Sequence, residues 1–210
     1  QPGHQNSHYN IALIKRDQGH IEEALKLLLK VLDLNPEHIE AKYNISMIKK
    51  SKGLLKEAKE HLQEILISDK QNEIAFQELM KVFAEMGDFK KVIDCMKSLN
   101  GAYSKNTASF AIFGLCLLTT GRFMEGWRYY EYRWKVSPGN KIIWPFPDKP
   151  VWKGERGKSV VLWKEQGIGD DIIFLSLVPE VKEICSSLSV YVDPRLEALC
   201  RRAMPEITFI

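Results

Sequence analysis

Hydrophobic residues in the first two-thirds of the chain recur with a period of 34 residues. Four glycines set the phase of this repeat, and each is followed at fixed intervals by an apolar, a small or compact, and a large apolar residue. The glycines are Gly19, Gly53, Gly87 and Gly121, and the small or compact residues are Ala24, Ala58, Val92 and Gly126. The pattern predicts stacked helix pairs, because a glycine allows a tight turn and a small residue lets the second helix approach its neighbour closely.

The pattern changes after residue 158, where strand-like and helix-like segments alternate. Four consecutive apolar residues at 160–163 predict a strand buried on both faces. A glycine turn follows, and Asp170 then begins a helix to about Ile184 that Pro179 should kink or interrupt. A second strand at 189–192, a helix from Asp193-Pro194 to about Met204 and a third strand at 207–210 complete the segment. We expect a parallel βαβαβ unit, with Asp170 at the carboxyl edge of its sheet.

Residues 135–158 connect the two patterns and are rich in proline and glycine. Such a composition argues against regular structure. The large apolar residues Trp144, Phe146, Val151 and Trp152 argue equally against a disordered tether, so we predict an ordered strap between helices and sheet. The predicted organisation is therefore a helical array at 1–134, a connector at 135–158 and an α/β segment at 159–210.

The last predicted helix of the array, 121–134, is rich in aromatic residues and arginine. That mixture is found in platforms that stack nucleic-acid bases. Four of its aromatic residues, Phe123, Trp127, Tyr130 and Trp134, share one helical stripe. A stripe of this kind is more typical of packing against a neighbouring domain, so we prefer that interpretation.

Bulk composition narrows the function classes further. The 210 residues carry a formal net charge of +3, which is too balanced to indicate nucleic acid or an anionic membrane as the main partner. The longest apolar run, Phe110 to Leu118, is too short to span a bilayer. The four cysteines form no C-x-x-C pair, which argues against a zinc or redox site and favours reduced thiols in a cytoplasm. The first residues show no signal peptide, and with no initiator Met we expect a fragment of a longer protein.

The 34-residue period, its repeated glycine and small-residue positions, and Asn35-Pro36 at the end of the first unit resemble the tetratricopeptide repeat (TPR) over about residues 7–134. The resemblance implies an α-solenoid that binds a protein or peptide in a groove lined by the first helix of each pair. The groove residues would include Tyr9, Asn10, Tyr43, Asn44 and Lys50.

Asn10 and Asn44 fall on equivalent positions of the repeat, and an Asn amide can hold a peptide backbone through a donor and an acceptor. The O-linked N-acetylglucosamine transferases carry such an asparagine ladder, but Glu78 and Ile112 end it here after two rungs. The alternative is that both asparagines are ordinary surface residues of the repeat. Tyr9, Leu13 and Ile74 depart from the basic clamp of chaperone-binding TPR proteins.

Four stretches in order, GRFMEGWRYYEYRW, PVWKGERGKSVVLW, EQGIGDDIIF and VYVDPRLEAL, resemble bacterial TPR proteins with a C-terminal glycosyltransferase-like domain. The resemblance implies the start of a Rossmann-like domain of GT-B architecture. The Gly169-Asp170 step after the first strand also resembles the lipopolysaccharide heptosyltransferases, and this second resemblance implies that Asp170 is the general base on the acceptor. Glu165, Gln166, Gly167 and Gly169 would form its acceptor or phosphate turn. A nucleotide sugar would be the donor of the whole protein, bound mainly by a second domain that these residues lack. The 210 residues alone should then hold no cofactor or metal and should not transfer sugar.

Two other interpretations of the glycine turn stay open. Asp170 and Asp171 can simply cap a helix and complement its dipole. A dinucleotide site is disfavoured, because Ile172 stands where its third glycine should be and two carboxylates would repel a pyrophosphate. We therefore interpret the chain as the N-terminal part of a TPR glycosyltransferase-like protein, and the alternative is a non-enzymatic TPR interaction scaffold.

Overall fold

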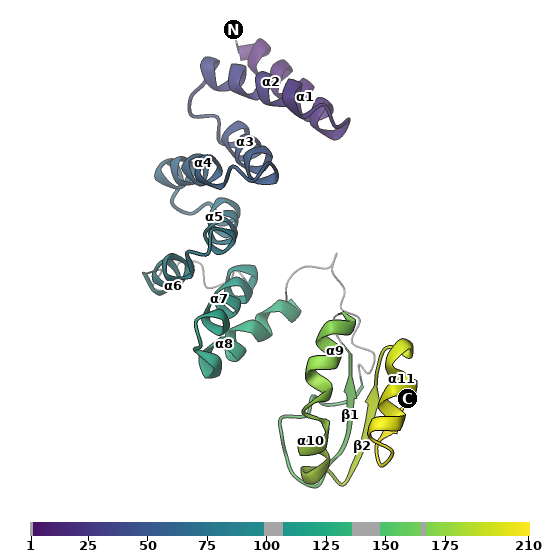
Figure 1. The fold of residues 1–210 in the computed structure, drawn as a ribbon. Coiled ribbons are helices and arrows are strands. Elements are labelled where there is room, and N and C mark those ends of the chain that lie inside the picture. The colour runs from purple at the N-terminus through teal and green to yellow at the C-terminus, as the bar shows by residue number, and fades with distance from the viewer. Residues whose placement is uncertain (1, 99–106, 136–147, 165–166) are drawn as a thin grey trace. The chain divides into compact units, whose positions relative to one another are not determined.

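The computed structural model describes residues 2–98, 107–135, 148–164 and 167–210. The chain divides into two compact units, residues 1–140 and 141–210, and each is described by itself below. Figure 1 shows the helices of unit 1 and the small sheet of unit 2.

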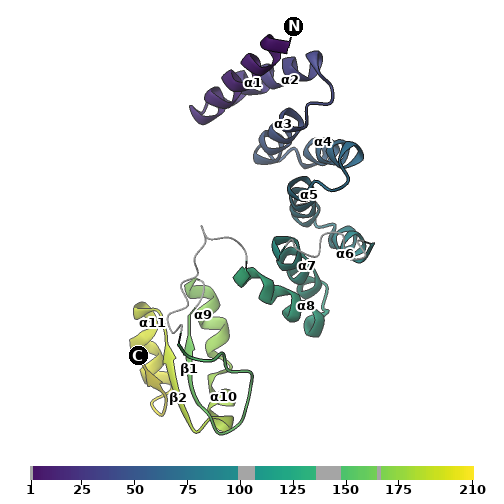
Figure 2. The ribbon, with the colours of Figure 1, turned by 180° about the vertical axis from the view of Figure 1, so that it is seen from behind.

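Unit 1 is a stack of antiparallel helix pairs (Figures 1 and 2). The first helices of the pairs, here the A helices, are α1 (Pro2–Asp17), α3 (Ile39–Ser51), α5 (Glu73–Glu85) and α7 (Thr107–Thr119). The second helices, the B helices, are α2 (Ile21–Leu34), α4 (Leu55–Ser68), α6 (Phe89–Ser98) and α8 (Phe123–Tyr130). A short 3₁₀ helix, η1 (Glu131–Lys135), follows α8.

The four glycines that set the repeat lie in the turns between A and B helices. All four have positive φ angles, between 74° and 82°, in the left-handed region that other residues rarely adopt. The small-residue positions predicted to allow close helix approach are all buried, with Ala24, Ala58 and Val92 at zero exposure. The sequence prediction of helix pairs with this register is therefore confirmed.

Each of the first three B helices packs against the A helix of the following pair. Ala24, Leu28 and Val31 of α2 share a buried cluster with Ala41, Ile45 and Ile48 of α3. The same arrangement recurs one period later, between α4 (Ala58, Leu62, Ile65) and α5 (Ala75, Leu79, Val82). Stability in such an array comes from these interfaces, because one pair cannot bury its own apolar face.

The last pair departs from the prediction. The aromatic stripe was expected on one continuous helix, but α8 ends at Tyr130 and the backbone tightens into η1. The tighter turn brings Tyr132 back against α7, where its ring lies 4.8 Å from that of Phe110. Trp134 therefore leaves the helical stripe, whereas Phe123 and Trp127 remain exposed on α8.

Unit 2 is a three-stranded parallel sheet with its strands in the order β1-β2-β3. The strands are β1 (Ser159–Trp163), β2 (Ser187–Tyr191) and β3 (Thr208–Phe209), and the helices are α9 (Ile168–Leu175), α10 (Val178–Ile184) and α11 (Pro194–Ala203). The predicted alternation of strands and helices is thus present. The expected interruption near Pro179 is confirmed, because α9 ends before it and α10 begins with this proline in its first turn.

Only one face of the sheet is buried by the described helices. Val160, Leu188 and Val190 pack in one cluster with residues of both α10 and α11. The other face carries Val161, which is 43% exposed, and Tyr191 opposite Trp163. The expectation that 160–163 is buried on both faces was therefore wrong. Four consecutive apolar residues are typical of a doubly buried strand, but the described helices α10 and α11 pack against the same face of this sheet.

The predicted connector is described only in part. Trp152 packs against the core of unit 2, and its indole nitrogen donates to the carbonyl of Glu155 at 2.9 Å. Trp144 and Phe146 lie outside the described residues, so the prediction of an ordered strap is not tested there.

Gly114 of α7 provides a test of the close approach in the last pair. A Cβ added at this position would lie 2.3 Å from the backbone nitrogen of Tyr130, so α7 and α8 would have to separate. We expect Gly114→Ala to lower the free energy of unfolding of the array by about 1–3 kcal/mol in urea titrations. Leu115→Ala, at a half-exposed position of the same helix, is the control and should change it by less than about 1 kcal/mol. Equal effects of the two substitutions would contradict the packing described here.

Candidate functional site

The A helices carry a periodic row of side chains at three positions of each repeat. The row, called here the A-helix seam, comprises Tyr9, Leu13, Arg16, Tyr43, Met47, Lys50, Gln77, Lys81 and Ala84. All nine are half-buried, so each keeps part of its side chain accessible while its stem is packed. Two of the predicted groove tyrosines and the predicted Lys50 therefore belong to one accessible row.

Asn44 lies beneath this seam and is engaged by its own chain. Its side chain is 6% exposed. Its amide oxygen accepts from Arg16 at 2.5 Å, and its amide nitrogen donates to the Tyr9 hydroxyl at 3.2 Å and to the Glu40 carbonyl at 2.8 Å. Both amide hydrogens are thus used within the array, and Asn44 ties α1 to α3.

The next repeat carries the same contact with different residues. Lys50 occupies the position of Arg16 one period later, and Glu78 occupies that of Asn44. The Lys50 ammonium lies 3.3 Å from Glu78 and 3.0 Å from Glu85, and Lys81 donates to Glu78 at 2.6 Å. Partial burial by itself lowers the pKa of Lys50, but the carboxylates of Glu85 and Glu78 outweigh it and the pKa is raised. A cation of one repeat thus pairs with a polar group of the next, twice in register.

Asn10 differs from Asn44 although the two occupy equivalent positions. Asn10 is exposed on α1, so it is available at the surface. An asparagine ladder needs two accessible amides in register, and this structure provides one accessible and one engaged amide. The role of both residues in peptide binding stays a prediction. Burial raises the pKa of Tyr9 and Tyr43, and the nearby carboxylates of Glu40 and Glu78 add to this shift, so both phenols stay neutral.

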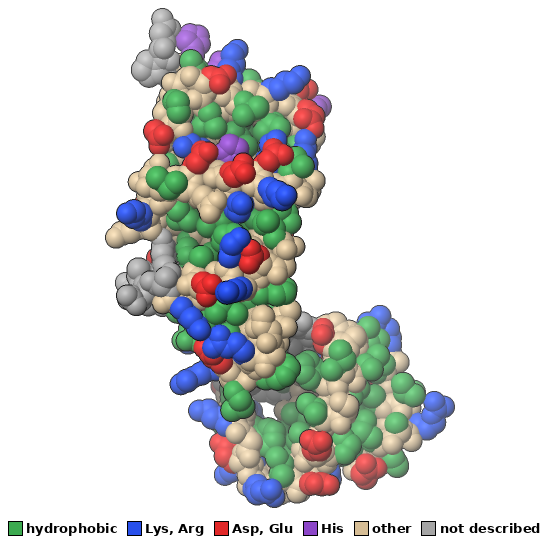
Figure 3. Space-filling view, turned by 60° about the vertical axis from the view of Figure 1, so that its left-hand side comes forward, with side chains coloured by type: hydrophobic (Ala, Val, Ile, Leu, Met, Phe, Trp, Pro, Cys, Tyr) green, Lys and Arg blue, Asp and Glu red, His purple; other side chains and the backbone are tan. Residues whose placement is uncertain are grey.

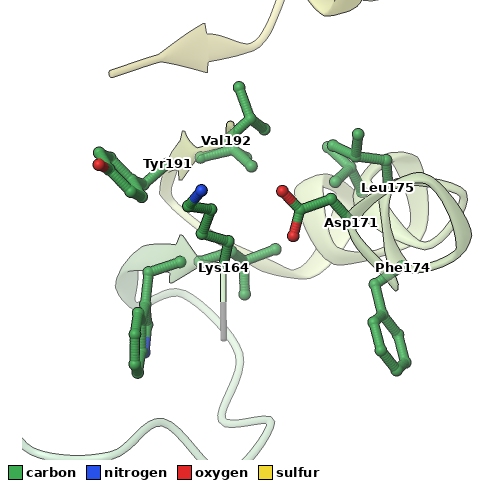
Figure 4. Close-up of a pocket in the computed structure, with 10 residues that line it drawn as sticks. Lys164, Asp171, Phe174, Leu175, Tyr191 and Val192 are labelled. Carbon is green, nitrogen blue, oxygen red and sulfur yellow. The ribbon is translucent and has the colours of Figure 1, made fainter. Parts of the chain in front are cut away.

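The second candidate site is a small cleft at the carboxyl ends of β1 and β2. Figure 4 shows the Lys164 and Asp171 side chains pointing toward one another across it, whereas Phe174 points away. Apolar residues complete the lining, among them Leu162, Leu175, Val178 and Val190. This is the sheet edge at which open α/β sheets place their ligands.

Asp193 joins the two strand ends. Its carboxylate accepts from Lys164 at 2.9 Å and from the Arg195 guanidinium at 2.8 and 3.0 Å, and it also caps α11 by accepting the backbone N–H of Arg195. The hydrogen bonds from Arg195, and then from Lys164, hold the pKa of Asp193 well below its ordinary value. The same pairing raises the pKa of Lys164. Lys164 is therefore a fixed positive charge beside the cleft.

The two aspartates of the glycine turn occupy different environments. Asp170 is half-buried in the first turn of α9 and is absent from the cleft lining. Asp171 is 8% exposed, lines the cleft and accepts the backbone N–H of Asp193 at 3.3 Å. Asp171 was expected only to cap the helix, and that interpretation was incomplete because its carboxylate reaches across to the end of β2.

The remaining turn residues are placed in part. Glu165 and Gln166 lie outside the described residues. Gly167 is exposed, and its carbonyl accepts the N–H groups of Asp170 and Asp171, which begins α9. A Cβ added at Gly169 would meet nothing within 4 Å, so this glycine leaves open space in front of the turn. A role for these residues at an acceptor or phosphate stays a prediction.

Sequence reasoning missed Lys164 as a cleft residue. The sequence does contain a signal for this residue, because Lys164 directly follows the first predicted strand and Asp193 directly follows the second. In parallel strands these two positions lie at the same edge of the sheet, so their pairing was predictable.

Some chemistry has no support in the described part of the chain. No three His, Cys, Asp or Glu side chains there are grouped as metal ligands would be. All four cysteines are free, and burial raises the pKa of the Cys116 thiol to about 11. Within the same described ranges, we find no helix with the length and apolar character needed to cross a membrane.

Comparison with known proteins supports the fold of the array. Residues 15–83 match the family model of the tetratricopeptide repeat. Over these residues, unit 1 is similar to an array of tetratricopeptide repeats. Proteins built from this repeat bind protein or peptide partners.

Solved structures support the same fold. A crystal structure of the MamA protein superposes with a TM-score of 0.58 at 19% identity, covering 67% of this chain and 76% of MamA. PilF of Pseudomonas aeruginosa gives a TM-score of 0.53 at 18% identity, covering 64% and 61% of the two chains. YrrB, described as a TPR protein with an unusual peptide-binding site, gives 0.52 at 22% identity, covering 63% and 69%.

One curated relative extends over both units. Protein FlbA of Caulobacter vibrioides is 25% identical over 206 residues, which cover 94% of this chain and 34% of FlbA. The chain thus spans about a third of the length of this relative.

Asn44 and Asn10 form a matched pair for testing the seam. We expect Asn44→Ala to lower the free energy of unfolding of the array by about 1–3 kcal/mol, because Arg16, Tyr9 and the Glu40 carbonyl lose their partner. Asn10→Ala removes an exposed amide and should change it by no more than about 0.5 kcal/mol. Urea unfolding followed by circular dichroism measures both. An unchanged free energy of unfolding in Asn44→Ala would show that the buried contacts do not stabilise the array.

The ionised carboxylate of Asp193 should make the stability of unit 2 fall at acidic pH. Its folded pKa lies well below the ordinary value of 3.8, so its stabilisation is fully present at neutral pH. This stabilisation begins to be lost near pH 4 and continues to fall as pH approaches the lower folded pKa. Between pH 6 and pH 3, the urea midpoint of the unmodified protein should therefore fall more than that of Asp193→Asn. The asparagine keeps an oxygen that can accept the N–H at the start of α11. Parallel losses in the two proteins would show that the charge of Asp193 does not contribute.

Proposed function

We propose that unit 1 is a protein-interaction scaffold that holds a segment of a partner protein along the A-helix seam. The observation that carries this proposal is the periodic row of nine half-buried side chains, which offers apolar, aromatic and basic groups in register over three repeats. A partner segment that follows the repeat can contact the same positions in turn. The match to a repeat family whose members bind proteins or peptides supports the proposal.

The charge distribution favours a protein partner over a polyanion. Lys50 and Lys81 are paired with Glu78 and Glu85, so the basic groups of the seam are largely neutralised where they lie. Figure 3 shows acidic and basic side chains interspersed over the visible face of unit 1. A mixed surface of this kind discriminates by local pairing and apolar contact.

Site-specific photocrosslinking in the native cells tests the scaffold. A photoreactive phenylalanine analogue at Met47 should crosslink to one partner protein, and the same partner should be recovered from Leu13 and Lys81. The control is Ile67 of α4, which is 76% exposed but lies outside the seam. Equal recovery from Ile67, or different proteins at each seam position, would contradict binding along the row.

A second candidate function is sugar transfer by the whole protein, for which unit 2 begins the acceptor-side domain. Three features support it: the cleft at the carboxyl edge, the open glycine turn before Asp170, and the resemblance of the EQGIGDDIIF stretch to glycosyltransferase-like proteins. Asp170 would accept the proton of the acceptor hydroxyl as the new C–O bond forms. The turn residues Glu165, Gln166, Gly167 and Gly169 would hold the acceptor, and a nucleotide sugar would be the donor.

The one-sided sheet fits the same candidate. Parallel sheets are normally covered on both faces, and a doubly wound domain provides the second helix layer with strands added beyond β1 or β3. Unit 2 has one layer among its described residues, and under this proposal the remaining layer and strands would belong to the rest of the whole protein.

Substitution of Asp170 in the full-length protein tests sugar transfer. Asp170→Asn should abolish transfer from a nucleotide sugar because the amide cannot accept the acceptor's proton. The thermal midpoint should stay unchanged, because Asn has the size of Asp and suits the first turn of α9. Unchanged transfer would assign Asp170 to capping of α9 and leave the scaffold as the function. The 210-residue chain alone should show no turnover of a nucleotide sugar, and robust turnover would contradict the division of the site between domains.

A further inference from the structure

The outer face of α1 has the composition of an interface between repeats. Ile11 and Ile14 are 44% and 56% exposed there. Their equivalents at later periods are buried: Ile45, Leu79 and Phe113 for the first position, and Ile48, Val82 and Cys116 for the second. All six of these equivalents are at most 5% exposed. The face that is buried three times in the array is thus open once, on α1.

What buries the equivalents is the same in each case. The B helix of the preceding pair covers Ile45 and Ile48 through Ala24, Leu28 and Val31. One period later Ala58, Leu62 and Ile65 cover Leu79 and Val82, and Val92 and Ile93 of α6 reach Cys116 and Phe113. The cover is therefore a helix with a small or compact residue, then aliphatic residues on the same face.

The last pair of the array is packed differently. η1 occupies the positions of the second half of a B helix in the first two pairs, and it packs against both α7 and α8. Tyr132 of η1 meets Phe110 and Tyr129 there. At the first pair, no described helix covers Ile11 and Ile14 of α1.

We propose that the open face of α1 is occupied in the native polypeptide by the B helix of a preceding repeat of the same chain. The interface continues the one that joins the three following pairs. It requires a glycine 34 residues before Gly19, a small residue 34 before Ala24, and aliphatic residues 34 before Leu28 and Val31. A helix of this pattern places a small side chain and two aliphatic ones against Ile11 and Ile14.

Ile14→Glu tests the proposal in the native full-length polypeptide, with Ile67→Glu as control. Ile67 is 76% exposed on α4, and its equivalent in the preceding repeat, Asp33, is also exposed. A glutamate buried by a preceding helix should lower the thermal midpoint by about 5 °C or more, against no more than about 2 °C for the control. If the glutamate variant does not fold, Ile14→Ala replaces it and should lower the midpoint by a smaller but measurable shift. In the 210-residue chain, both glutamate substitutions should lower the thermal midpoint by no more than about 2 °C.

Three results would overturn the proposal. The first is a native polypeptide whose residues before Gln1 lack the glycine and small-residue pattern. The second is an Ile14→Glu shift in that polypeptide no larger than the control. The third is a dimer of the 210-residue chain, detected by sedimentation equilibrium and abolished by Ile14→Glu, because a second copy would then be the occupant.

Discussion

The structure of unit 1 depends on one contact that is repeated: a B helix that buries the apolar face of the next A helix. The contact needs a small or compact residue where the helices come closest, and Ala24, Ala58 and Val92 occupy this position in the first three B helices. A glycine with a positive φ angle joins the A and B helices of each pair, and this turn reverses the direction of the chain between them. The seam follows from this spacing, since equivalent side chains of successive A helices are placed side by side.

Polar contacts then give the seam its chemistry. Arg16 with Asn44, and Lys50 with Glu78, place a cation of one repeat on a polar group of the next. These contacts lie between A helices, and at Asn44 they occupy the amide group that could otherwise hydrogen-bond a peptide. The accessible part of the seam is consequently aromatic, aliphatic and locally charge-paired, which suits recognition of a protein segment better than capture of a charged polymer. In unit 2, Lys164 and Asp193 likewise join two elements, the ends of β1 and β2.

The fold was largely predictable from the sequence, because periodicity and glycine turns are local signals. The helix pairs, the parallel strands and the interruption at Pro179 all followed from spacing. What failed depended on contacts distant in sequence. The exposure of Val161 depends on which side α10 and α11 pack, and the break after Tyr130 depends on Tyr132 meeting Phe110. At the candidate sites, the engagement of Asn44 by Tyr9 and the reach of Asp171 to Asp193 join residues 35 and 22 positions apart, which spacing alone does not reveal.

Hydrogen exchange of the purified 210-residue chain tests the central contact most directly, because amide protection reports local stability helix by helix. If each A helix is stabilised by the B helix before it, amides of α3 and α5 should be strongly protected. Amides of α1, whose outer face is open, should exchange much faster. Protection of α1 equal to that of α5 would contradict the account, since it would show that the array does not depend on cover from the preceding pair.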